Sequence, residues 1–152
     1  MYRDILLAVD LDDEASWREA LPACVEYARA FGSVLHVMTV VPAMGTGFVG
    51  SFFPADFERK AMEAARQRLH AFVRAQVAPG IPVQHVVAHG SVYKEVLRVS
   101  EEIACDLIVV AASGPDLGTF LLGPNAARIV RHATRSVLVV RNRDEGGGAA
   151  AV

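Results

Sequence analysis

Two groups of residues in this sequence have the types and spacing to do chemistry. The first is a set of carboxylates, Asp10, Asp12 and Asp13, which directly follows an apolar run over residues 5–9. Carboxylates this close together can hold Mg²⁺ jointly with the phosphates of a ligand. They can also cap the start of a helix, where backbone N–H groups and the helix dipole favour negative charge. Capping is the commoner use, so we predict no metal ligands and no catalytic residues in this chain.

The second group is a glycine-bearing segment that includes Gly114 and Gly123 and continues into Pro124 and Asn125. A buried strand, a glycine loop and a helix N-terminus in this order form a concavity lined with N–H groups, which suits a phosphate. The glycine spacing matches neither the dinucleotide-binding fingerprint nor the Walker loop, and no Gly-Lys-Ser or Gly-Lys-Thr occurs. Ordinary turn glycines and a phosphate loop are both consistent with this pattern.

Strands and helices alternate around these two groups. Apolar runs predict buried strands, and apolar residues at three- and four-residue steps predict helices between them. The predicted strands cover residues 5–9, 33–41, 83–88, 107–110 and 136–140. The predicted helices cover residues 13–31 and 54–77, the segment after Ser91, and a segment opened by Gly123, Pro124 and Asn125. Proline is tolerated at the first helical position because its missing N–H has no partner there.

Several residues predict details of these helices. Pro22 predicts a kink or a late start in the first helix, and Gly32 predicts its C-cap. Ser91 is expected to cap the third helix at its N-terminus. Residues at i, i+4, i+7 and i+11 predict the face of the third helix that packs on the sheet, namely Val92, Val96, Val99 and Ile103.

This order of elements predicts an α/β protein with a parallel sheet, because connections of this length require right-handed crossovers that cover both faces with helices. Ligands of such sheets sit beyond the carboxyl ends of the strands, where the winding reverses. If the first and fourth strands flank that point, Asp10, the end of the second strand near Val40, and the loop over 111–125 converge there.

Length and composition limit the class of protein. The 152 residues suit a single domain, which we assign to residues 1–141, and 53% of the residues are hydrophobic. No apolar run approaches the ~20 residues of a membrane span. The net charge is −2 and the isoelectric point about 6.2, so no global field favours nucleic acid or an anionic membrane. We expect neither as a partner.

The chain starts without a secretory signal and contains two cysteines, Cys24 and Cys105, in apolar surroundings without metal-ligand spacing. Buried free thiols in a reducing compartment are the simplest interpretation, and we predict a cytoplasmic protein. The segment over 43–53 mixes glycines with aromatic residues, and it is expected either to cover the core or to act as a lid or contact surface. The glycine- and alanine-rich tail, residues 142–152, is expected to be disordered.

The last third of the chain resembles the universal stress protein family, in the branch whose helix opens with the motif Leu-Leu-Gly-Ser-Asn-Ala. The matching residues are Pro115-Asp116, Leu121-Leu122-Gly123-Pro124-Asn125-Ala126, Val130-Arg131-His132-Ala133 and Val137-Leu138-Val139-Val140-Arg141. The run from Ile5 to Asp10 resembles the family's first strand, and His89-Gly90-Ser91 resembles the exit from its third. The resemblance is strong in the last third and looser elsewhere.

The resemblance implies an open five-stranded sheet of order 3-2-1-4-5 with helices on both faces, a Rossmann-like fold also called adenine nucleotide alpha hydrolase-like. It also implies binding of ATP, alone or with Mg²⁺, by a protein that is at most a weak ATPase. Carried over by position, Asp10 and the backbone at Ala8 and Val40 would face the adenosine. The residues implied at the phosphates are Ala111, Gly114, Gly123 and Asn125.

Two residues depart from the family's pattern. Ala111 stands where the family has its first glycine, and Pro124 replaces the Ser or Thr that follows the last glycine. Proline removes a hydroxyl and an N–H together at the helix start. The resemblance therefore leaves two interpretations of function open. One is an adenine-nucleotide-binding, stress-response regulatory protein acting through dimer or partner contacts, and the other is an interaction module of the same fold that has lost the nucleotide.

A third class is a phosphoacceptor receiver domain, which also has five strands and an acidic cluster after the first. That class needs a phosphorylatable Asp at the end of the third strand, where this chain has Ala88-His89-Gly90, and a Lys at the end of the fifth, which is absent. We therefore set it aside.

The fifth strand is predicted to lie at the sheet's edge and to pair with a second copy of the chain, since a long bare apolar edge invites pairing. The residues predicted to form this contact are Val137, Leu138, Val139 and Val140.

Overall fold

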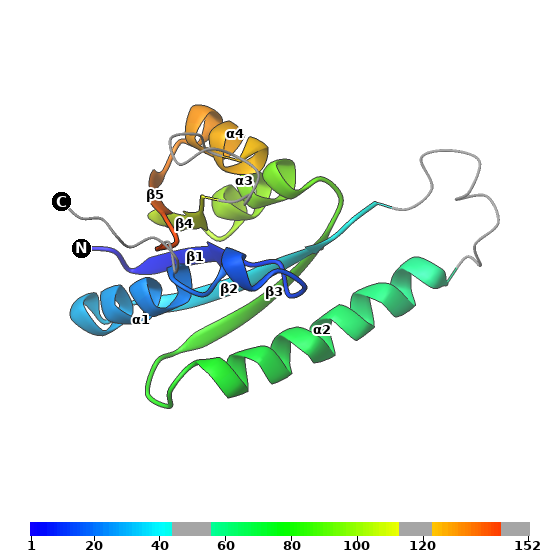
Figure 1. Cartoon of the computed structure of the whole chain (residues 1–152), viewed down its shortest axis with the longest axis horizontal. Coiled ribbons are helices and arrows are strands. Elements are labelled where there is room, and N and C mark those ends of the chain that lie inside the picture. The colour runs from blue at the N-terminus through cyan, green and yellow to red at the C-terminus, as the bar shows by residue number, and fades with distance from the viewer. Residues whose placement is uncertain (44–55, 113–122, 144–152) are drawn as a thin grey trace.

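The computed structural model describes residues 1–43, 56–112 and 123–143 (Figure 1). Its strands are β1 (Asp4–Ala8), β2 (Val34–Val41), β3 (Val83–His89), β4 (Leu107–Ala111) and β5 (Ser136–Val140). Its helices are the short 3-10 helix η1 (Glu14–Ser16) and the α-helices α1 (Ala20–Phe31), α2 (Phe57–Gln76), α3 (Val92–Glu102) and α4 (Pro124–His132). The five predicted strands are confirmed, with ends that differ by one residue at most.

The strands form one parallel sheet in the order β3-β2-β1-β4-β5, as predicted. β1 lies at the centre, with β2 on one side and β4 on the other, so the direction of winding reverses between β1 and β4. All five residues of β4 are buried, which explains why that strand is apolar on both faces. The carboxyl ends of β1 and β4 thus meet at the switch point.

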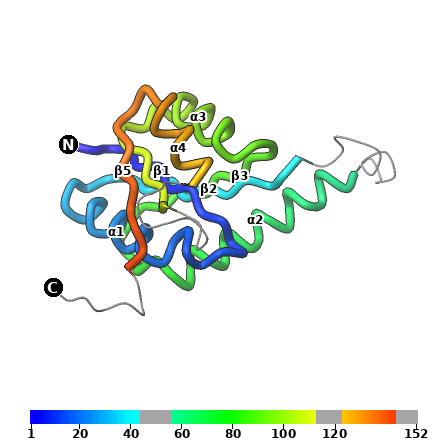
Figure 2. Tube along the Cα trace, turned by 45° about the horizontal axis from the view of Figure 1, so that its top comes forward, coloured from blue at the N-terminus to red at the C-terminus, as the bar shows by residue number. Residues whose placement is uncertain are grey.

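Helices cover both faces of the sheet (Figures 1 and 2). On one face, Ile5 and Leu7 of β1 pack with Leu21 of α1 and Leu69 of α2. On the opposite face, Leu6 packs with α3 and α4 residues such as Val96 and Ile129. Successive side chains of β1 point to opposite faces of the sheet, so neighbouring residues of this strand belong to the cores on its two faces. This is the two-layer covering that the alternating strands and helices predict.

The first helix starts late, as Pro22 predicts. The segment after β1 forms η1, and α1 begins only at Ala20, which places Pro22 in the first turn, where its missing N–H costs nothing. Gly32 is the C-cap of α1 with φ of 67°, a left-handed conformation that favours glycine. The helix predicted from residue 54 begins at Phe57 in the described part of the chain.

Ser91 is the N-cap residue of α3, as predicted, although its side chain makes no capping hydrogen bond. The predicted packing face of α3 is wrong at one residue. Val92 does not pack on the sheet with Val96 and Val99, since it is 38% exposed. As the first residue of α3, Val92 lies beyond the carboxyl edge of the sheet, where the apolar stripe has no strand left to contact. It lines a pocket there instead.

The amino edge of the sheet is closed by internal hydrogen bonds. The Asp106 carboxylate accepts hydrogen bonds from the backbone N–H groups of Arg3 and Asp4, at 2.9 and 3.0 Å. His36 of β2 contacts the Asp4 carboxylate at 2.9 Å, so this histidine is a structural residue of the sheet. Polar groups at this edge therefore satisfy one another.

Both cysteines are buried free thiols, as predicted. Burial raises the pKa of the Cys24 thiol to about 12 and that of Cys105 to about 11, so both stay protonated and unreactive at neutral pH.

After β5, the Asn142 side-chain amide donates a 2.8 Å hydrogen bond to the Ala15 carbonyl. The remainder of the predicted tail, residues 144–152, and the segment over 44–53 lie outside the described residues. None of the described helices is both long and apolar enough to cross a membrane.

Candidate functional site

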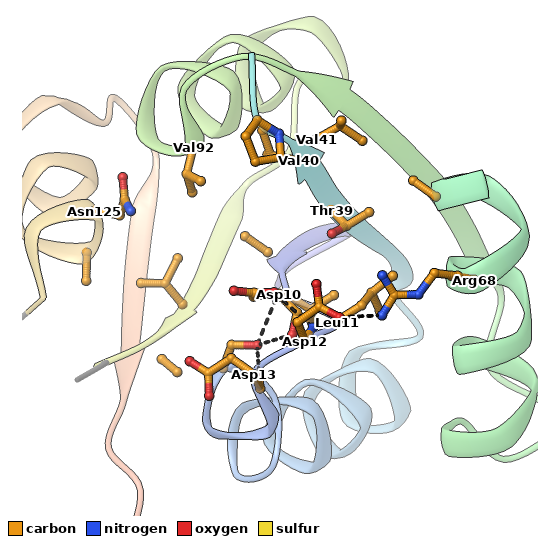
Figure 3. Close-up of a pocket in the computed structure, with 18 of the residues that line it drawn as sticks. Asp10, Leu11, Asp12, Asp13, Thr39, Val40, Val41, Arg68, Val92 and Asn125 are labelled. Carbon is orange, nitrogen blue, oxygen red and sulfur yellow. Dashed lines mark hydrogen bonds and ion pairs between the residues drawn. The ribbon is translucent and has the colours of Figure 1, made fainter. Parts of the chain in front are cut away.

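A cavity of about 590 Å³ opens beyond the carboxyl ends of β1, β2 and β4 (Figure 3). Its volume is in the range of small-molecule sites. Of the residues predicted to converge here, five line the cavity, namely Ala8, Asp10, Val40, Ala111 and Asn125. The convergence at the switch point is therefore confirmed for residues from four separate segments of the chain.

The loop after β1 brings Asp10 into the lining of the cavity (Figure 3). Oδ1 of Asp10 accepts a 2.9 Å hydrogen bond from the backbone N–H of Asp12. The Ser16 hydroxyl oxygen accepts the Asp10 N–H at 2.8 Å and lies within hydrogen-bond distance of the Asp10 and Asp13 carbonyls, at 3.0 and 2.8 Å. Within the described residues, Oδ2 of Asp10 has no hydrogen-bond partner, so it remains available to a ligand.

The acidic cluster is explained by capping. The Asp13 side chain accepts a 3.1 Å hydrogen bond from the Ala15 N–H and so caps η1. Asp12 is paired with Arg68 on α2, whose Nη2 lies 2.8 Å from Oδ1. No group of three or more metal-ligating side chains occurs in the part of the chain that the structure describes. The three carboxylates thus serve mainly to shape the loop.

The wall formed by α2 is one that sequence reasoning missed. Ala61, Ala64, Ala65 and Arg68 line the cavity from this helix. Their spacing of i, i+3, i+4 and i+7 places them on one helix face. The small side chains leave room for a ligand, and the arginine closes one end of the cavity. This pattern was visible in the sequence, but alanines in a helix are usually neutral fillers, and Arg68 resembled the other solvated cations of α2.

The opposite end of the cavity is formed by the start of α4. Gly123 is the N-cap in an extended conformation, Pro124 is the first helical residue, and no side chain caps this helix within the described residues. The first helical hydrogen bond runs from the Ala127 N–H to the Gly123 carbonyl at 2.9 Å. The N–H groups of Asn125 and Ala126 precede it, so they have no partner within the helix. The Asn125 side chain lies across the cavity from Arg68 (Figure 3).

Two further predicted residues, Gly123 and Pro124, do not line the cavity. Gly123 is buried and Pro124 exposed, and both adjoin Asn125 without forming part of the wall. Gly114 lies outside the described residues, as do Pro115, Asp116, Leu121 and Leu122. Further residues that line the cavity were not predicted from the sequence, among them Ser16, Thr39 and Val92.

The lining is suited to binding. It combines apolar walls from β1, β2 and β4 with a few polar groups at fixed positions, which is the usual composition of a ligand site. Among the described residues of the wall there is no histidine, cysteine or lysine. The carboxylates lie at the Arg68 end, whereas the α4 end offers a positive helix dipole and N–H groups that have no partner among the described residues. An elongated ligand with one neutral and one anionic end matches this distribution of charge.

The fold and the site together define a doubly wound α/β protein with a ligand pocket at its topological switch point. The family model for the universal stress protein family matches residues 1–141. This chain therefore belongs to that family, as the residues of its last third suggested. Universal stress protein G of Escherichia coli O157:H7 is 31% identical over 144 residues, which is 93% of this chain and 100% of that protein.

Solved structures agree on the fold. Universal stress protein UspA from Lactobacillus plantarum matches with a TM-score of 0.67 and 25% identity, covering 92% of this chain and 98% of that one. A universal stress protein in complex with cAMP matches with a TM-score of 0.61 and 22% identity, over 92% and 97% of the two chains. The universal stress protein from Archaeoglobus fulgidus in complex with dAMP matches with a TM-score of 0.61 and 18% identity, covering 91% of this chain and 98% of that one.

Proposed function

We propose that this protein binds an adenine nucleotide in the switch-point cavity and acts as a stress-response regulator. The observation that carries the proposal is the cavity of about 590 Å³, with the Asp10 carboxylate and Val40 on one side and, on the other, the start of α4, which no described side chain caps. Two proteins of the same fold have been solved with adenine nucleotides, cAMP in one and dAMP in the other.

The charges favour one orientation of the ligand. Phosphate groups are repelled by Asp10, Asp12 and Asp13, whereas the N–H groups at the start of α4 attract them. We therefore place the adenosine between Ala8, Asp10 and Val40, with Oδ2 of Asp10 accepting a hydrogen bond from it. Ala111, Asn125 and the glycines Gly114 and Gly123 face the phosphates in this arrangement. ATP is the proposed ligand, with Mg²⁺ held mainly by the phosphates if it is present.

We propose regulation rather than enzymatic turnover. The described wall of the cavity holds no histidine, cysteine or lysine, so carboxylates are the main candidates there for general acid-base catalysis. Asp12 is paired with Arg68, the Asp13 carboxylate accepts the Ala15 N–H, and we assign the free Oδ2 of Asp10 to ligand binding. ATP hydrolysis, if measured, is expected to be slow.

Calorimetric titration of the purified protein with ATP, ADP, AMP and GTP tests the proposal. Adenine nucleotides should bind with one site per chain, and Asp10→Asn should weaken them. Asp56→Asn is the matched control, because Asp56 lies at the start of α2 and pairs with Lys60 outside the cavity. Equal weakening by both changes, or equal binding of GTP, would contradict the proposed site.

A second candidate is an interaction module of the same fold that has lost the nucleotide. Pro124 favours it, because the first residue of α4 has neither an N–H nor a hydroxyl for a phosphate. Native mass spectrometry of the protein as purified separates the two candidates. Mass added by a nucleotide supports the first, and a bare chain that also fails to take up ATP supports the second.

The partner contacts are proposed to include a homodimer through β5. This strand pairs only with β4 and lies at the edge of the sheet, and Val137, Leu138, Val139 and Val140 are half-buried in a single chain. Val139→Lys should give monomers in sedimentation analysis. Gln84→Lys, on the exposed surface of the other edge strand β3, should leave the dimer intact. A dimer that survives Val139→Lys and dissociates with Gln84→Lys would place the interface at β3.

A further inference from the structure

A pair of histidines lies where α2 packs against β3, away from the cavity. The rings of His70 on α2 and His85 on β3 have centres 5.2 Å apart and planes tilted by 51°. Within the described residues, neither ring makes a hydrogen bond or an ion pair. Their nitrogen atoms are therefore not used by the protein itself.

The position of His85 in the strand is unusual. Val83 and Val87, two residues before and after it, face the core beneath α1 and α2. Strand alternation puts His85 on this same α2-facing side. An apolar residue would extend that packing, so an imidazole here is not explained by the core. His70 directly follows Leu69, which anchors α2 in the same core.

The distance between the rings is that of two ligands on one metal ion. Zn²⁺ lies about 2.0–2.1 Å from an imidazole nitrogen, hence about 3.2 Å from the ring centre, so two rings at a tetrahedral angle have centres about 5 Å apart. The observed separation is 5.2 Å. Both side chains are exposed, so each ring can rotate to direct a nitrogen at the ion. Partial desolvation and the nearby His70 lower the pKa of His85.

We propose that His70 and His85 form a binding site for a divalent transition-metal ion such as Zn²⁺, which ties α2 to the edge strand β3. Imidazole suits Zn²⁺, Ni²⁺ and Cu²⁺, whereas Mg²⁺ and Ca²⁺ prefer oxygen ligands. No third protein ligand joins the pair in the described part of the chain, so water completes the coordination. Arg66 and Arg74 lie one turn before and one turn after His70 on α2. Their positive charges repel a metal ion, so we expect a moderate affinity and rapid exchange of the ion.

The site has a structural consequence for α2. This helix of 20 residues has only Leu69 and Val73 fully buried, yet its Ala64 and Arg68 line the cavity on another face. A metal ion bridging His70 and His85 binds only the folded arrangement, and it therefore stabilises the docking of α2. The metal site does not depend on the proposed nucleotide function, since it uses neither the cavity nor its residues.

Titration of the untagged full chain with zinc chloride at pH 7.5 tests this proposal. We expect one Zn²⁺ per chain by calorimetry, and at least tenfold weaker binding in His70→Ala, in His85→Ala and in the double variant, because two ligands are needed together. His132→Ala is the matched control, an exposed histidine on α4, and should bind as the native protein does. Equal loss in His132→Ala, or unchanged binding in His85→Ala, overturns the proposal.

Two further measurements exclude a folding artefact. In the presence of EDTA, His70→Ala and His85→Ala should melt at the temperature of the native protein, and added Zn²⁺ should raise the melting temperature of the native protein alone. Binding that is lost in His89→Ala, where the ring contacts Glu58 at 3.2 Å, and retained in His85→Ala would place the ion at a different site and overturn the assignment.

Discussion

At the Asp10 end of the cavity, backbone and side-chain groups satisfy one another, whereas at the Gly123 end a helix begins with no side-chain cap. Asp10, Asp13 and Ser16 accept three backbone N–H groups of their own loop. α4 instead starts with Pro124, and its next N–H groups have no partner within the helix. The comparison indicates that hydrogen bonds within the protein shape the first end, whereas the first N–H groups of α4 make none within their own helix.

The largest expected effect comes from removing the Asp10 carboxylate. In Asp10→Asn the side-chain oxygen can still accept the Asp12 N–H, so the loop keeps its shape. The variant loses the charged acceptor Oδ2, which is worth roughly 1.5–3 kcal/mol to a ligand hydrogen bond. Adenine-nucleotide affinity should fall roughly ten- to a hundredfold by calorimetry. Unchanged affinity would mean that Asp10 only shapes the loop.

Adding a cap at the opposite end should act in the other direction. Pro124→Ser supplies a hydroxyl and an N–H at the start of α4, each able to make a charge-assisted hydrogen bond to a phosphate. Nucleotide affinity should rise about tenfold, more for ATP than for ADP. The native protein should correspondingly show little preference between the two.

Pro124 adjoins the cavity without lining it, so this experiment also locates the phosphates. Equal affinities of the native protein and Pro124→Ser would show that position 124 does not touch them. Absence of binding in both proteins would favour the ligand-free module.

A substitution of Ser16 measures how much the hydrogen bonds at the Asp10 end contribute to the stability of the fold. The Ser16 hydroxyl accepts the Asp10 N–H at 2.8 Å and contacts the Asp10 and Asp13 carbonyls. Ser16→Ala should lower the free energy of unfolding by about 0.5–1.5 kcal/mol in urea denaturation, because the solvent-exposed loop loses the hydrogen bonds of this hydroxyl. Ser91→Ala is the control at an exposed serine without a capping bond, and it should change stability by a few tenths of a kcal/mol at most.

The smallest effect is expected from the ion pair of Arg68 with Asp12. Both side chains are more than half exposed, and pairs of this kind contribute about 0.2–1 kcal/mol. Arg68→Gln should therefore lower the free energy of unfolding only slightly at low salt, and not measurably in 1 M NaCl. Its effect on nucleotide affinity separates a structural pair from a ligand contact. A change in affinity with no change in stability would assign Arg68 to ligand binding.

Much of the architecture follows from the sequence alone. The apolar runs at β1, β2 and β4 and the glycine at position 32 identify the strands and the end of α1 because they depend on local periodicity and backbone freedom. The parallel sheet follows from the order of elements. That order also brings Asp10 and Asn125 to one place, because the carboxyl ends of neighbouring parallel strands share an edge.

Tertiary structure decided what the helices contribute. Arg68 resembles Arg66 in sequence, yet only Arg68 points into the cavity, since the rotation of α2 over the sheet selects one face of it. Val92 belongs to the apolar stripe of α3 but passes beyond the end of the strands, so it lines the cavity. His70 and His85 belong to different elements and have no common motif. Periodicity tells which residues share a face, whereas only the docking of that face decides what lies opposite.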